Sequence, residues 1–150
     1  MAKRILVPLD RTTASAAILP LVADVARGAG PTLRLLQVAP VPDAVEGEHG
    51  RVIAYADQEM ARLESEGLEY LDALAADLPD VAVECVVRFG HPVREILVEA
   101  EAWDADLIAV TATRTRWFDR IRRGVADRVY RRASVPVLVY RSGAVNPDAP

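Results

Sequence analysis

Polar and charged side chains follow an apolar run near the end of this 150-residue chain. The run Leu107–Val110 is typical of a buried strand, and threonines and arginines come after it, at Thr111, Thr113, Arg114, Thr115, Arg116 and Arg120. In an open α/β sheet, the loop after a strand's carboxyl end binds ligands, and the start of the next helix attracts phosphate. The residue types and their place predict an anion-binding loop, although its first glycine is Gly124.

Arginine is concentrated in this part of the chain. Residues 114–132 hold eight arginines and two aspartates, whereas the whole chain carries a net charge of −4. A basic patch on an acidic protein predicts an anionic small molecule or an acidic protein as partner; the alternative is a solvated helix face with i, i+4 ion pairs. Trp117 and Phe118 either pack inward or offer a stacking surface of the kind that nucleic-acid binding uses. The acidic balance of the chain argues against nucleic acid.

Residues suited to nucleophilic or metal catalysis are sparse. The histidines are His49 and His91, and neither is paired in sequence with a serine nucleophile. Two histidines and the single cysteine, Cys85, give no zinc-ligand spacing. Asp104 and Asp106 come directly before a predicted strand and indicate turn chemistry. The sequence therefore favours a binding module over an enzyme, with no metal and no required cofactor.

Apolar periodicity predicts the elements that position these residues. Strands are expected at 4–9, 32–38, 81–87, 107–110 and 137–140, as short runs rich in β-branched residues. Three- and four-residue apolar steps predict helices between them, with a kink or a late helix start at Pro20. Strands that alternate with helices imply right-handed crossovers. The fold class is therefore a single doubly wound α/β domain, a five-stranded parallel sheet with helices on both faces.

The two ends of the chain bear on its location. The N-terminal apolar run, residues 5–9, is too short for a signal peptide, and no apolar run approaches the ~20 residues that cross a bilayer. A single cysteine builds no disulfide framework. We expect a cytoplasmic protein that does not insert into membranes, with a domain at 1–141 and a disordered tail at 142–150.

Four separated segments resemble the universal stress protein family in order and spacing. They are RILVPLD at 4–10, LRLLQV at 33–38, FGHPVREILVEAEAWDADLIAV at 89–110 and VADRVYRRASVPVLVYR at 125–141. The resemblance implies the adenine nucleotide alpha hydrolase-like, Rossmann-like form of the fold. It also implies a homodimer through the last strand, whose edge residues are Val137, Leu138, Val139 and Tyr140.

Family members that bind ATP carry a glycine motif after the fourth strand: glycine, two residues, glycine, nine residues, glycine, then serine or threonine. The glycines let the backbone approach the phosphates, and the hydroxyl helps to hold them. Here Thr111 and Arg114 occupy the first two glycine positions, and Val125 follows Gly124 where the hydroxyl belongs. With a one-residue deletion, Gly124 instead replaces the hydroxyl residue and Arg123 the glycine. Either alignment loses at least two elements and implies weak or absent ATP binding.

The other half of the family's nucleotide site matches this chain. Asp10 corresponds to an aspartate that can bind ribose or adenine, and Pro8 and Val38 border the base, although all three also suit a plain sheet and turn. The candidate nucleotide-binding residues are Pro8, Leu9, Asp10, Val38, Val110, Thr111, Thr113, Arg114, Gly124 and Val125. The ligand would be ATP or another adenine nucleotide, smaller or cyclic.

The resemblance thus favours a dimeric stress-response binding and regulatory module with a degenerate ATP site. One alternative is a nucleotide switch or slow ATPase that uses the retained half of the site. Another is an interaction protein that docks an acidic partner through its arginine-rich surface, in which case binding should weaken steeply with salt.

Overall fold

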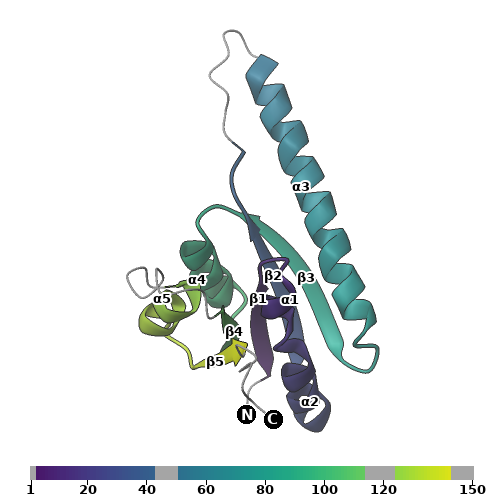
Figure 1. The fold of residues 1–150 in the computed structure, drawn as a ribbon, viewed down its shortest axis with the longest axis vertical. Coiled ribbons are helices and arrows are strands. Elements are labelled where there is room, and N and C mark those ends of the chain that lie inside the picture. The colour runs from purple at the N-terminus through teal and green to yellow at the C-terminus, as the bar shows by residue number, and fades with distance from the viewer. Residues whose placement is uncertain (1–2, 43–50, 114–123, 143–150) are drawn as a thin grey trace, which may run out of the picture.

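Five parallel strands form one sheet in the order β3-β2-β1-β4-β5 (Figure 1). The computed structural model describes residues 3–42, 51–113 and 124–142. The strands are β1 (Arg4–Leu9), β2 (Thr32–Ala39), β3 (Ala82–Phe89), β4 (Leu107–Thr113) and β5 (Val137–Ser142). The predicted α/β class, parallel sheet and strand order along the chain are confirmed. Trp117, Phe118, His49 and most of the predicted tail lie outside the described residues.

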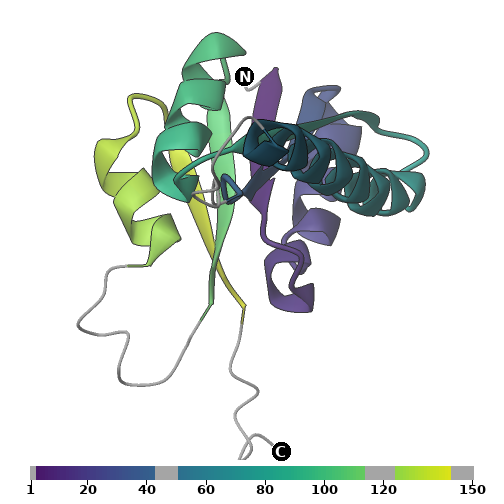
Figure 2. The same cartoon turned by 90° about the horizontal axis from the view of Figure 1, so that it is seen from above.

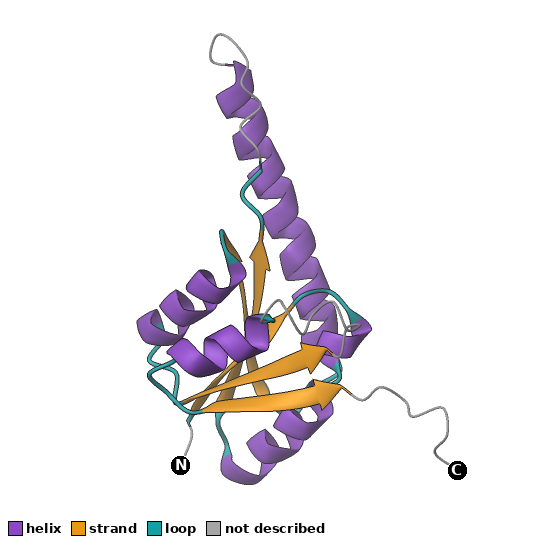
Figure 3. Cartoon of the chain, turned by 60° about the vertical axis from the view of Figure 1, so that its left-hand side comes forward, coloured by secondary structure: helices purple, strands orange, loops and turns teal. Residues whose placement is uncertain are grey.

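Helices cover both faces of the sheet, as predicted (Figures 2 and 3). One face carries α1 (Thr13–Ala16), α2 (Leu19–Ala29) and α3 (Arg51–Ala76), and the other carries α4 (Pro92–Ala102) and α5 (Val125–Arg132). The 26-residue helix α3 is longer than the strands that it covers, and its N-terminal part extends beyond the sheet (Figure 1).

Local chemistry explains where the first helical segment breaks. Thr12 caps α1 by accepting a hydrogen bond from the amide of Ser15, so the helix begins directly after β1. Pro20 stands in the first turn of α2, where its missing amide hydrogen breaks no helical bond. The predicted late start is therefore a division into two helices. Gly30, with φ of 75°, ends α2 in the left-handed conformation.

Two strands are longer than predicted. β4 continues past Val110 to Thr113, and β5 continues past Tyr140 to Ser142, one residue into the predicted tail. The two extensions pair with each other, Thr111 with Tyr140 and Thr113 with Ser142. Threonine suits a strand because its β-branched side chain fits the pleated surface. The assignment of Thr111 and Thr113 to an irregular loop was therefore wrong.

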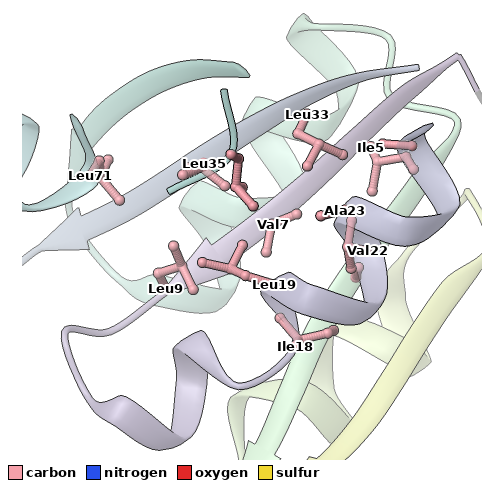
Figure 4. Close-up of a cluster of buried hydrophobic side chains, with 13 residues drawn as sticks. Ile5, Val7, Leu9, Ile18, Leu19, Val22, Ala23, Leu33, Leu35 and Leu71 are labelled. Carbon is pink, nitrogen blue, oxygen red and sulfur yellow. The ribbon is translucent and has the colours of Figure 1, made fainter. Parts of the chain in front are cut away.

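The core has two parts, one on each face of the sheet. The first is built by alternate residues of β1 and β2, such as Val7 and Leu35, against α2 and α3 (Figure 4). The second sets Leu6 and Leu36, which point to the opposite face, against α4 and α5. The central strands are thus buried on both faces, as parallel strands under two helical layers must be.

Ion pairs hold α4 to the sheet. Glu99 of α4 is 4% exposed, and its two carboxylate oxygens accept hydrogen bonds from Arg34 of β2 and Arg88 of β3, at 2.7 and 2.8 Å. Each arginine also pairs with a second glutamate, Glu84 for Arg34 and Glu95 for Arg88. Removing one partner of such a cluster would leave a buried charge uncompensated. The network therefore fixes α4 over β2 and β3.

Gly67 lets α3 approach the sheet closely. A Cβ atom at this position would lie 2.8 Å from both Oε1 of Gln37 and Cγ2 of Val87. Gln37 is 7% exposed, and its Oε1 has no hydrogen-bond partner among the described residues. Because Gln37 pairs with Leu9, the last residue of β1, the contact brings the middle of α3 to the carboxyl edge of the sheet.

We expect Gly67→Ala to lower the free energy of unfolding by about 1–3 kcal/mol, because the added methyl group overpacks the contact with the sheet. Alanine is intrinsically better than glycine in a helix by about 1 kcal/mol, so a loss would show that packing dominates. Gly28→Ala is the matched control: Gly28 lies in α2, and an added Cβ there meets nothing within 4 Å. Urea denaturation should show Gly28→Ala to be neutral or stabilising, and a stabilised Gly67→Ala would contradict the prediction.

Candidate functional site

The chain changes direction between β1 and β4. These strands are neighbours and pair in register near their amino ends, Ile5 with Leu107 and Leu6 with Ile108. After β1 the chain turns to α1 on one face of the sheet, whereas the helix that follows β4, α5, lies on the other (Figure 2). Crossovers that leave on opposite faces open a crevice outside the carboxyl ends of two neighbouring strands, the usual ligand site of this fold class. The candidate site is therefore built around Asp10 and Thr111.

A hydrogen-bonded turn holds Asp10 at this point. Its Oδ1 accepts hydrogen bonds from the amide and the hydroxyl of Thr12, at 3.0 and 2.6 Å. Its own amide donates to Oγ of Ser15 at 3.1 Å, and Ser15 in turn donates to the carbonyl oxygen of Thr12. These bonds fix the position of the Asp10 carboxylate at the crevice. They occupy Oδ1, and the described residues place no hydrogen bond on Oδ2.

Thr111 links β4 to α1. Its hydroxyl donates a 3.0 Å hydrogen bond to the carbonyl oxygen of Ser15 in α1. Asp10, Thr12, Ser15 and Thr111 thus form one chain of hydrogen bonds from the end of β1 to the end of β4. The structure connects Asp10 to Thr111 through Thr12 and Ser15, and the sequence patterns did not single out Ser15.

Neighbouring groups lower the pKa of the Asp10 carboxyl group. Partial burial acts to raise the pKa of Asp10, but the hydrogen bonds that the hydroxyl and the amide of Thr12 donate to the carboxylate lower it more. The net result is a pKa below the ordinary value of 3.8. Asp10 is therefore a charged acceptor at neutral pH, the state required to bind a sugar hydroxyl or an amino group.

Four other candidate residues lie mainly in the core. Pro8, Leu9 and Val110 are buried, and Val38 is half-buried in the cluster under α4. The Leu9 side chain belongs to the core on the opposite face, which leaves its backbone as the part available to a ligand. A base bordered by Val38 would therefore meet an apolar surface.

The start of α5 holds two further candidate residues, Gly124 and Val125. Gly124 is the N-cap residue, with φ of −64°, and it makes no side-chain cap. An added Cβ at Gly124 would meet nothing within 4 Å, and Val125 after it is 39% exposed. Asp127 stands in the first turn and pairs with Arg131 at 3.2 Å. Arg114 lies outside the described residues, and the side chain of Thr113 is not described.

Three residues beside Asp10 were not predicted. Arg11 has φ of 70°, a left-handed conformation that costs a non-glycine residue about 1–2 kcal/mol. Its guanidinium lies 4.0 Å from the carboxylate of Glu66 in α3. Burial raises the pKa of Tyr70, the negative charge of Asp10 adds to the rise and Arg11 opposes it, so the phenol senses both charges. Arginine has no preference for this backbone conformation, so the sequence offered no signal for it.

Two hollows lie between neighbouring helices. One of about 320 Å³ is lined by residues of α2 and α3, and one of about 210 Å³ by residues of α4 and α5.

Within the described ranges, no cluster of histidine, cysteine, aspartate or glutamate residues could hold a metal ion. Of the helices that the structure describes, none is long and apolar enough to cross a membrane.

Comparison with known proteins places this arrangement in a family. The model of the universal stress protein family matches residues 1–141. A universal stress protein in complex with cAMP has a TM-score of 0.70 and 17% identity, over 95% of this chain and 98% of its own. The universal stress protein UspA from Lactobacillus plantarum has a TM-score of 0.67 and 23% identity, and the match covers 93% of this chain and 97% of UspA. A universal stress protein family protein from Arabidopsis thaliana with AMP bound has a TM-score of 0.63 and 15% identity, and the match covers 95% of this chain and 93% of that protein. No curated protein sequence matches.

The hydrogen bonds on Asp10 predict how acid affects stability. Because its pKa is lowered in the folded state, the ionised carboxylate stabilises the fold above the unfolded pKa, and this contribution is lost as the pH falls through the folded pKa. The difference in unfolding free energy between the wild type and Asp10→Asn should therefore be largest near neutrality and shrink below about pH 4.

Denaturant titrations at several pH values would measure this difference. The control is the same comparison in a Thr12→Ala background, which removes the hydroxyl that donates to Asp10. There the dependence on pH should be weaker. A difference that stays constant from pH 3 to pH 7 would contradict the assignment.

Proposed function

Because this chain belongs to the universal stress protein family, we propose that it is a binding and regulatory module with a degenerate adenine-nucleotide site. The site comprises Asp10, Val38 and the backbone of Pro8 and Leu9 on one side, and the Thr111 end of β4 with the start of α5 on the other. In this proposal the first group binds base and ribose, and the second group holds a triphosphate poorly.

The observation that carries the proposal is the hydrogen bond from Thr111 to Ser15. A glycine at position 111 would let a polyphosphate approach the backbone closely. The threonine instead places a side chain there and ties it to α1. Binding a triphosphate along this path would require breaking that bond and displacing the side chain.

The start of α5 supports the same conclusion. A serine or threonine after Gly124 would offer a hydroxyl to a phosphate, whereas Val125 offers an apolar side chain. The affinity for a highly charged ligand is therefore reduced.

The retained half of the site favours smaller adenine nucleotides. Oδ2 of Asp10 is available as a charged acceptor, and Val38 at the end of β2 is an apolar residue that is only half-buried. Two structural relatives hold cAMP and AMP, ligands with a single phosphate. A ligand of this size depends less on the glycine motif than ATP does.

Isothermal titration calorimetry should therefore show weak or no binding of Mg-ATP and measurable binding of AMP or cAMP. A triple variant, Thr111→Gly with Arg114→Gly and Val125→Ser, restores the family motif and should raise the ATP affinity at least about tenfold, which corresponds to about 1.4 kcal/mol. Val98→Ser, an exposed substitution on α4, is the control. Micromolar ATP binding by the wild type would overturn the degenerate-site proposal and revive the nucleotide switch or slow ATPase.

We further propose that the protein is a homodimer paired through β5. β5 is an edge strand of the sheet, and an uncovered edge offers backbone groups for pairing. Leu138 on this strand is 39% exposed, and Tyr130 on the neighbouring α5 is 61% exposed. Pairing with a second copy would cover both the strand edge and these side chains.

Leu138→Asp should dissociate the dimer, because it places a charge in the apolar interface. Light scattering after size-exclusion chromatography should give a mass near twice 16.3 kDa for the wild type and near 16.3 kDa for the variant. Val98→Asp is matched in exposure, also 39%, but lies on α4. It should remain dimeric. A monomeric wild type, or a dimeric Leu138→Asp, would contradict the model.

A further inference from the structure

We propose that Arg11 selects nucleotides over uncharged nucleosides, by exchanging its ion pair with Glu66 for a contact with the ligand's phosphate. The inference rests on the proposed adenine-nucleotide site and names the residue that gives this site its preference for an anion. With the glycine motif at β4 altered, the cation that the described residues offer beside Asp10 is the Arg11 guanidinium.

The backbone of Arg11 is held in a costly conformation. Its φ of 70° is one of two positive values among the described non-glycine residues, the other being 59° at Asp104. The flanking residues enforce it: the Asp10 amide bonds to Ser15, and the Thr12 amide bonds to Asp10. Strained residues that their surroundings hold in place concentrate at ligand sites. A glycine would satisfy the same turn without strain, so the arginine side chain needs another explanation.

The side chain of Arg11 is weakly engaged. Its contact with Glu66 is 4.0 Å long, and the two side chains are 39% and 42% exposed. Glu66 has a closer partner in Arg62, which donates a hydrogen bond to it at 2.6 Å. When Arg11 moves to a ligand, Glu66 therefore keeps its hydrogen bond from Arg62, which also pairs with Glu59. Exposed pairs of this kind contribute little, so the exchange is inexpensive.

The groups around Arg11 suit a nucleoside phosphate. The carboxylate of Asp10 accepts hydrogen bonds, and the guanidinium of Arg11 donates them in a planar fork that matches a phosphate. The phenol of Tyr70 senses the charges of both residues.

Arg11→Gly provides the test, because it removes the guanidinium and relieves the strain at once. Calorimetric titration with AMP, cAMP and adenosine should show that the variant loses about tenfold in affinity for AMP or cAMP and keeps the wild-type affinity for adenosine. Its melting temperature should rise by about 3 °C. Glu66→Gln, which removes the competing carboxylate, should bind AMP more tightly than the wild type.

Asp104→Gly is the matched control, since it relieves the other left-handed residue, at the end of α4 and outside the site. It should raise the melting temperature and leave every affinity unchanged. If AMP and cAMP bind and Arg11→Gly keeps the wild-type ratio of nucleotide to adenosine affinity, the role of Arg11 is overturned while the proposed function stands. If the wild type binds neither nucleotides nor adenosine, both proposals fail.

Discussion

The central position of β1 is the constraint on which the rest of the structure depends. β1 pairs with β2 on one side and β4 on the other, and its side chains are buried on both faces. Asp106, just before β4, reinforces the pairing of β1 with β4, because its carboxylate accepts hydrogen bonds from the backbone amides of Lys3 and Arg4 at 2.8 and 2.9 Å. Because the chain leaves β1 and β4 toward opposite faces, the crevice has to open beside Asp10. Fold and candidate site therefore follow from one arrangement of strands.

Thr111 stabilises the fold at the position where the proposed ligand would approach the backbone. The hydrogen bond from Thr111 to Ser15 joins the end of β4 to α1, where a glycine would leave the approach open to a polyphosphate. Arg11 differs from Thr111, because its left-handed backbone destabilises the fold and no described contact of its side chain explains why an arginine stands there. In the proposed site, Thr111 would hinder the approach of a polyphosphate, and Arg11 would offer a positive charge to a single phosphate.

Contacts elsewhere hold the helices against the sheet. The pair of hydrogen bonds from Arg34 and Arg88 to Glu99 fixes α4, and the contact of Gly67 with Gln37 fixes α3. Glu99 is 65 residues away from Arg34 along the chain, so neither periodicity nor spacing could reveal the network. Such a cluster depends on which strands become neighbours, which is a property of the whole fold.

The sequence by itself determined the elements that local chemistry controls. Apolar periodicity located all five strands and the helices between them, Pro20 marked the division between α1 and α2, and four segments identified the family. Tertiary structure decided the rest. β4 extends to Thr113 because β5 supplies backbone partners there, and Arg11 is left-handed because bonds around Asp10 hold the turn. Local patterns fix a residue's preference, but contacts between distant segments fix its conformation and its partners.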